Sequence, residues 1–130
     1  MEVFMNNENI VRNGFGLPEE YHGHPGGISR VVIGPEVMNP ERPDAINSER
    51  LVIHTNEYQV GGNAGHPHAH SNQEQAFYIL EGKMEVTVGD DTYIAVSGDT
   101  VFLPHNVMHG HRNVGDVPLK FVFISAMLEI

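Results

Sequence analysis

Histidine is the residue type of this sequence best suited to chemistry, and three histidines fall on alternate positions. His66, His68 and His70 lie within Gly62–Gly82, which reads GNAGHPHAHSNQEQAFYILEG. Side chains two positions apart on a β-strand point to the same face, so a strand here would bring His68 and His70 to one point. Two imidazoles on one face, joined by a ligand from a neighbouring strand, form a transition-metal site. The spacing therefore indicates part of a metal site.

A second stretch, Gly98–Asn113, supplies a further imidazole. It reads GDTVFLPHNVMHGHRN and contains His109 five residues after Pro104. Together the two stretches resemble the paired motifs of the cupin family, G-x5-H-x-H-x3–4-E-x6-G and G-x5-P-x-G-x2-H-x3-N. The matching positions are Gly62, His68, His70, Gly82, Gly98, Pro104, His109 and Asn113, and the fifteen residues Lys83–Ser97 separate the motifs. The resemblance covers residues 51–127, most of the chain.

The resemblance implies an all-β fold, the double-stranded β-helix or jelly-roll barrel of the cupins, with a bound metal ion. The ligands that it implies are His68, His70, Gln75 and His109. Three imidazoles and one amide oxygen suit Zn, Mn, Fe, Ni and Co alike, so the expected cofactor is a divalent transition metal ion of unspecified identity. Two coordination positions would remain for water, dioxygen or substrate. The alternative for Gln75 is a hydrogen bond to water or histidine without contact to the ion.

The sequence departs from the cupin motifs at two positions. Asn106 stands where the second motif usually has glycine, and asparagine tolerates a positive φ better than other non-glycine residues. Gln75 stands where the first motif has glutamate, so the ligand set carries no negative charge. Glu74 could restore a carboxylate only if a bulge turned it inward, because neighbouring residues on a strand point to opposite faces.

The missing carboxylate favours a small metalloenzyme that uses the divalent ion as a Lewis acid on a small oxygenated organic substrate, as an isomerase, cyclase or lyase. The layout is also similar to that of cupin sugar-acid ring-opening enzymes and polyketide cyclases. Two alternatives stay open. One is a mononuclear metal-dependent dioxygenase, and the other is a non-catalytic cupin that captures a ligand or a metal.

His111 is the candidate catalytic residue. It lies two positions after His109, so the two side chains are expected to share the inward face, where His111 could act as a base or as a fifth ligand. For His66 and His54 the sequence leaves a functional and a merely structural role open. His105 follows a proline in a turn, and we expect it to face solvent.

Composition narrows the function classes. The chain has 130 residues, enough for one domain with a substantial core, and contains no cysteine, which fits a cytoplasmic protein without disulfides. Its formal net charge of −10 argues against nucleic acid or an anionic membrane as partner. The stretch Met1–Ile10 has neither the basic start nor the apolar run of a signal peptide, so we expect no export signal.

The order of short apolar runs and glycine turns predicts the domain organisation. Residues 1–27 show no sustained period, so we expect a flexible or peripheral N-terminal arm in which His22 and His24 lie in a solvated loop. Residues 28–130 are expected to form one barrel domain. The proline-rich segment Gly34–Arg50 is expected to be a loop, either a lid over the barrel mouth or a plain surface excursion. Strands are expected over Ile28–Ile33, Leu51–Val60, Gly65–His70, Gln75–Glu81, Met84–Val88, Thr92–Val96, Val101–Leu103, Val107–Arg112 and Leu119–Met127.

The strand expected over Gln75–Glu81 is apolar on both faces. Phe77 and Ile79 share one side, and Tyr78 and Leu80 share the other. One face would serve the core of the barrel, and the second requires another sheet or another subunit to cover it. We therefore expect a homodimer. The substrate expected for the metal site is a small molecule.

Overall fold

The computed structural model describes residues 10–17, 19, 25–35 and 45–128. Strands dominate this part of the chain, and the predicted all-β fold is confirmed. The elements are η1 (Gly14–Gly16), β1 (Gly27–Gly34), β2 (Ile46–Asn47), β3 (Leu51–Tyr58), β4 (Gln73–Glu81), β5 (Lys83–Val88), β6 (Asp91–Val96), β7 (Thr100–Leu103), β8 (His109–Asn113) and β9 (Leu119–Met127). Across these described ranges, no helix has the length and apolar character needed to cross a membrane.

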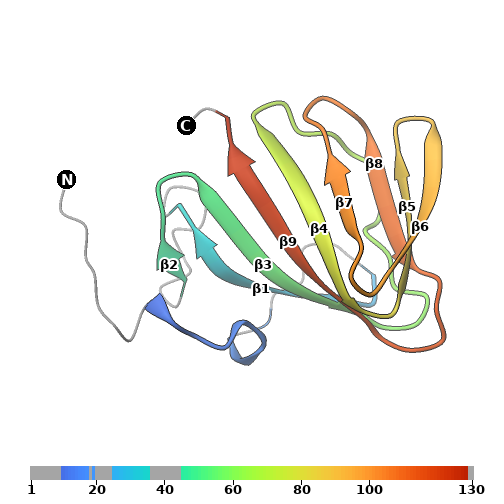
Figure 1. The fold of residues 1–130 in the computed structure, drawn as a ribbon, viewed down its shortest axis with the longest axis horizontal. Helices are drawn as coiled ribbons and strands as arrows, with labels where there is room; N and C mark the ends of the chain where they lie inside the picture. Colours follow the sequence, from blue (N-terminus) through green and yellow to red (C-terminus); the bar gives the residue numbers. More distant parts are fainter. Residues whose placement is uncertain (1–9, 18, 20–24, 36–44, 129–130) are drawn as a thin grey trace.

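The strands form two sheets. A six-stranded sheet has the order β2-β1-β3-β9-β4-β7, and a three-stranded sheet has the order β6-β5-β8. All of these pairings are antiparallel except that of β1 with β2. Figure 1 shows the smaller sheet beside the end of the larger sheet that carries β4 and β7. The chain passes between the sheets several times, as a jelly-roll barrel requires.

The hydrophobic core lies between the two sheets. Phe77 and Phe121 from the larger sheet and Met84 and Val86 from the smaller one are almost completely buried. Burial of one such side chain stabilises the fold by roughly 1.5–3 kcal/mol. None of the predicted metal ligands belongs to this cluster. The core therefore supplies folding energy that does not depend on an ion.

The prediction of a strand over Gly65–His70 is wrong. The structure has a loop here, and among the described residues only a single bridge, between His68 and His109, joins it to β8. The reason is local: Gly65 adopts a φ of 80°, outside the strand region, and Pro67 has no N–H to donate to a ladder. The other predicted strands are present, and their ends differ from the prediction by at most two residues. For example, β8 begins at His109 and not at the predicted Val107.

Part of the predicted N-terminal arm contacts the larger sheet. Asn13 caps η1 through a 3.0 Å bond from the Phe15 N–H, and the Thr55 hydroxyl donates to the Gly14 carbonyl at 2.7 Å. Arg30 on β1 donates to the Leu17 carbonyl at 3.2 Å. His22, His24 and residues 36–44 of the predicted loop lie outside the described residues. The end of that loop forms β2.

Candidate metal centre

Among the backbone hydrogen bonds that join the two motif stretches, three involve the candidate ligands His68, His70 or His109. The N–H of His68 donates to the carbonyl of His109 at 3.0 Å, and the N–H of His109 donates back to the carbonyl of His68 at 2.8 Å. The N–H of Asn106 donates to the carbonyl of His70 at 2.6 Å. Asn106 has a φ of 63°, the positive value that its place in the motif predicted. Because these bonds fix the backbone next to each histidine, they also fix where the imidazoles lie.

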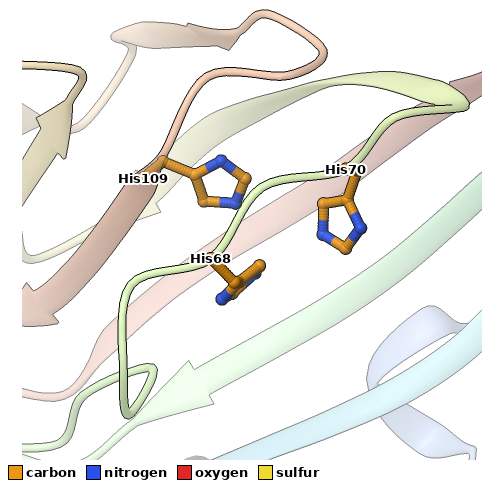
Figure 2. A group of neighbouring side chains, drawn as sticks. All are labelled: His68, His70 and His109. Atoms are coloured by element: carbon orange, nitrogen blue, oxygen red, sulfur yellow. The ribbon is translucent and has the colours of Figure 1, made fainter.

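The three histidines converge. His68 and His70 extend from the loop before β4 and His109 extends from the start of β8, as Figure 2 shows. One nitrogen from each ring lies within 4.8 Å of the others, and the ring centroids are 4.6 to 5.7 Å apart. Ligand nitrogens around a divalent transition metal lie about 2.0–2.1 Å from the ion, so separations of this order suit one shared ion. The group can hold a metal ion.

The lowered pKa values of His70 and His109 fit metal binding. Burial, with His68 and His70 nearby, lowers the pKa of His109 to about 4, although a backbone hydrogen bond at Val107 opposes the shift. Burial and His68 also lower the pKa of His70. At neutral pH these two rings are therefore neutral, the form that ligates metal. The Nδ1 of His68 lies 3.3 Å from the carbonyl of His66, which favours a proton on Nδ1 and leaves Nε2 as the ligand atom.

Gln75 is 4% exposed and lines the cavity onto which the three histidines open. Its Nε2 donates to Oε1 of Gln73 at 3.0 Å, and the hydroxyl of the fully buried Ser125 donates to the same oxygen. Because the amide nitrogen of Gln75 is already bonded, its amide oxygen is the atom left for an ion. Whether that oxygen ligates a metal stays a prediction. The donor set of three imidazoles and one such oxygen fits a divalent transition metal ion.

His111 shares the inward face with His109, as the strand period predicted. Its Nε2 lies 2.9 Å from the hydroxyl of Tyr58, and its ring centroid is 4.7 Å from that of Phe77. Burial raises the pKa of Tyr58, so the phenol keeps its proton at neutral pH. His111 lies outside the three-histidine group, and the hydrogen-bonded pair that it forms with Tyr58 is a place where a proton can be held beside the cavity.

The remaining candidates separate into two groups. His54 lines the cavity, with its ring centroid 5.1 Å from that of Phe123. Glu74, His66 and His105 are exposed and do not line the cavity. The strand around Glu74 is regular, with Glu74 opposite Ala126, so no bulge turns its carboxylate inward.

Motif residues that are not candidate metal ligands stabilise the backbone around the site. Asn113 accepts from the Gly115 N–H at 2.9 Å, and its Nδ2 donates to the carbonyls of Tyr58 at 3.1 Å and Val117 at 2.9 Å. Gly82 has a φ of 94°, and a Cβ there would lie 2.9 Å from the backbone of Leu119. These positions therefore favour asparagine and glycine for structural reasons.

The histidines open onto a cavity of about 230 Å³ inside the barrel. It is lined by Ser29, Val52, His54, Asn56, Tyr58, His68, His70, Gln73, Gln75, Phe77, His109, His111, Phe121 and Phe123. Gln73, Ser29 and Ser125 lie outside the motif positions from which the site was predicted. A signal existed for two of them: Gln73 shares strand parity with Gln75, and Ser125 is a polar residue on the inward face of an otherwise apolar strand.

The fold and site together define a cupin. Residues 54–125 match the cupin domain family, and this match covers more than half of the chain. The chain therefore belongs to the cupin family, as its two motifs indicated.

Curated proteins similar to this chain match less than half of its length. An uncharacterized protein of Methanocaldococcus jannaschii is 36% identical over 58 residues, 45% of this chain and 46% of that protein. The matched segments span less than half the length of this relative and of three other curated relatives.

Two solved structures share the fold at low sequence identity. A predicted oxalate decarboxylase of Thermotoga maritima has a TM-score of 0.74 and 18% identity, covering 92% of this chain and 100% of that one. The polyketide cyclase RemF of Streptomyces resistomycificus has a TM-score of 0.69 and 24% identity, covering 92% and 79%.

Proposed function

We propose that this protein is a metal-dependent cupin enzyme in which a divalent ion acts as a Lewis acid on a small oxygenated organic molecule, in an isomerisation, cyclisation or elimination. One observation carries the proposal: three imidazoles converge in a cavity whose lining, among the described residues, contains no Asp, Glu, Lys or Arg. The absence of cysteine supports a cytoplasmic location as part of the same proposal.

The neutral lining supports Lewis-acid chemistry over oxidation in this proposal. A divalent ion at such a site would keep its full charge and would polarise a substrate oxygen, stabilising negative charge that develops on it. The imidazoles of His68, His70 and His109 and the amide oxygen of Gln75 would hold the ion. A glutamate in place of Gln75 would instead neutralise part of that charge and favour a more oxidised metal.

Proton transfer falls to His111 in this proposal. Its Nε2 lies 2.9 Å from the Tyr58 hydroxyl in a hydrogen bond, and both residues line the cavity. A base here could take a proton from a substrate carbon or hydroxyl beside the ion. The names of the two structural neighbours, a polyketide cyclase and a predicted oxalate decarboxylase, denote chemistry on oxygenated organic molecules and support the proposal to that extent.

The test combines metal analysis with turnover. The protein is purified without added metal, its metal content is measured, and a panel of oxygenated substrates is assayed while oxygen uptake is followed. We expect close to one divalent ion per chain and turnover without oxygen consumption. His68→Ala should lose both the ion and the activity, whereas His105→Ala, which removes an exposed histidine near the site, should keep both. Turnover coupled to oxygen uptake would show a dioxygenase instead, and full metal content without any turnover would support a non-catalytic binder.

A further inference from the structure

We infer that the cavity accepts a flat, uncharged, conjugated ring that carries two neighbouring oxygens, and that it discriminates against sugar acids and other substrates with a carboxylate outside the chelating group. The inference rests on the proposed function for the ion that receives the two oxygens. The nature of the cavity wall is a separate observation.

Part of the cavity wall is a continuous set of aromatic rings. The Phe77 centroid lies 5.0 Å from that of Phe121 and 6.2 Å from that of Phe123. Tyr58 continues the set 5.3 Å from Phe121, and His54 continues it 5.1 Å from Phe123. Aromatic rings pair favourably at centroid separations of about 4.5–7 Å, with a stabilisation beyond that of their buried area. A flat ring in the cavity can make such contacts, and a puckered, hydroxylated sugar ring cannot make them equally well.

No lysine or arginine among the described residues lines the cavity, where it could pair with a substrate carboxylate. Arg30 pairs with Glu57 at 2.6 Å and with Glu19 at 3.1 Å, and Arg112 pairs with Glu85 at 3.0 Å. None of these residues lines the cavity, and neither does any lysine. A carboxylate that did not bind the ion would therefore lose its hydration without gaining an ion pair, which is costly.

Many polar groups of the wall bond to one another. The hydroxyl of Ser29 donates to Oδ1 of Asn56, and Gln75 donates to Gln73. The Tyr58 hydroxyl bonds to His111. A polyhydroxylated substrate would have to break these bonds or bury its own hydroxyls without partners, and each unsatisfied buried group weakens binding. An uncharged ring whose oxygens all reach the ion avoids this cost.

The size of the cavity fits one substituted ring. Its volume is about 230 Å³, whereas a buried apolar cavity of about 150 Å³ is enough to hold benzene. The remaining space suits the ring oxygens and a short substituent.

Two hydroxypyranones of equal size provide a matched test. Kojic acid is uncharged and carries a hydroxymethyl group, and comenic acid carries a carboxylate at the same ring position. Both keep the same neighbouring pair of oxygens. Binding of each, and of glucuronate, is measured by calorimetry on protein loaded with Zn²⁺ and freed of excess ion. We expect kojic acid to bind at least tenfold more tightly than comenic acid, with glucuronate the weakest. Equal affinities, or tighter binding of either acid, would overturn the inference.

Phe123→Leu tests the aromatic wall with little loss of apolar volume, and Phe102→Leu is the matched control because Phe102 is 58% exposed and does not line this cavity. We expect Phe123→Leu to lower the affinity for kojic acid at least fivefold and to leave the affinity for Zn²⁺ unchanged. Phe102→Leu should change neither affinity. An unchanged affinity for kojic acid in Phe123→Leu would contradict the role of the wall.

The failure of this inference and the failure of the proposed function give different results. Binding of phenol to metal-free protein is followed by chemical-shift changes in the aromatic residues of the wall. If Zn²⁺ does not bind while phenol does, the proposed function fails and the aromatic wall stands. If Zn²⁺ binds but neither phenol nor kojic acid does, the inference about the substrate fails alone.

Discussion

Gln73 and Gln75 are bonded side chain to side chain, with Nε2 of Gln75 donating to Oε1 of Gln73 at 3.0 Å. The hydroxyl of Ser125 donates to that same oxygen from the neighbouring strand, where Ser125 is opposite Gln75. An amide side chain offers an oxygen at one end and a nitrogen at the other, and only the oxygen can ligate a metal cation. The bond to Gln73 uses the nitrogen, so Gln75 is set to present its oxygen.

Gln75→Glu should increase the affinity for a hard divalent ion such as Mn²⁺. Glutamate has a similar length and adds a negative charge to the ligand set, so attraction to the ion grows. Calorimetric titration of metal-free protein with Mn²⁺ measures the effect, and we expect at least a tenfold gain. Lewis-acid turnover near neutral pH should fall, because the charge on the ion is partly neutralised. An unchanged affinity would show that Gln75 does not touch the metal.

Ser125→Ala should lower metal affinity through Gln73 and Gln75. Removal of a group that orients a metal ligand typically costs about 10–100-fold in affinity. The effect should disappear in the Gln75→Glu background, because both carboxylate oxygens can ligate and orientation no longer matters. Ser97→Ala, which removes an exposed hydroxyl bonded to the Leu80 carbonyl, is the control and should change nothing. The same loss of affinity in both backgrounds would indicate general damage to the barrel.

Removal of the metal should leave a folded protein. The buried core cluster contains none of the three histidines, and its apolar residues keep their burial without an ion. Chelator-treated protein should therefore melt cooperatively, with a lower Tm that reflects only the lost binding energy. Near-UV circular dichroism and calorimetry measure this. Loss of the cooperative transition would make the site structural and would weaken the enzyme proposal.

Acid should destabilise the metal-free protein through His109. Its pKa is held at about 4, below the usual 6.5. As the pH falls below 6.5, the unfolded chain takes up the proton first, so stability decreases until His109 itself is protonated near pH 4. The loss of stability is therefore confined to the interval between about pH 6.5 and pH 4. Urea titrations of wild type and His109→Gln should show a shallower pH dependence in the variant, and His105→Gln should match wild type. Equal slopes in all three would refute this assignment.

The homodimer expected from the sequence stays a prediction. In the single chain the outer face of β4 is open, with Tyr78 42% and Leu80 39% exposed. Phe102 on β7 lies opposite Ala76 and extends the same apolar face. Light scattering at micromolar concentration should give twice the chain mass, and Tyr78→Lys should shift the protein towards the monomer. Val60→Lys, in the turn after β3, should leave the mass unchanged. A monomeric wild type would remove the idea.

The sequence predicted the convergence of His68, His70 and His109 for a reason that was partly wrong. Strand alternation was expected to aim His68 and His70, but their segment is a loop. What brings the rings together is the set of backbone bonds from His109 and Asn106, whose residues lie some forty positions further along the chain. The fixed spacing of the two motifs reflects that long-range pairing. It therefore predicted the convergence of the histidines correctly, although the strand predicted from local alternation is absent.

By itself, the sequence determined the all-β fold, the cupin family, the three converging histidines and the inward face shared by His109 and His111. These follow from local period, turn residues and motif spacing, which the chain displays in order. Only the tertiary structure decided that Ser125 and Gln73 orient Gln75, that Tyr58 holds His111, and that the cavity wall is aromatic and uncharged. The Ser125–Gln73 and Tyr58–His111 bonds join residues 52 and 53 positions apart in the chain. They depend on strand order and register, which no local pattern specifies.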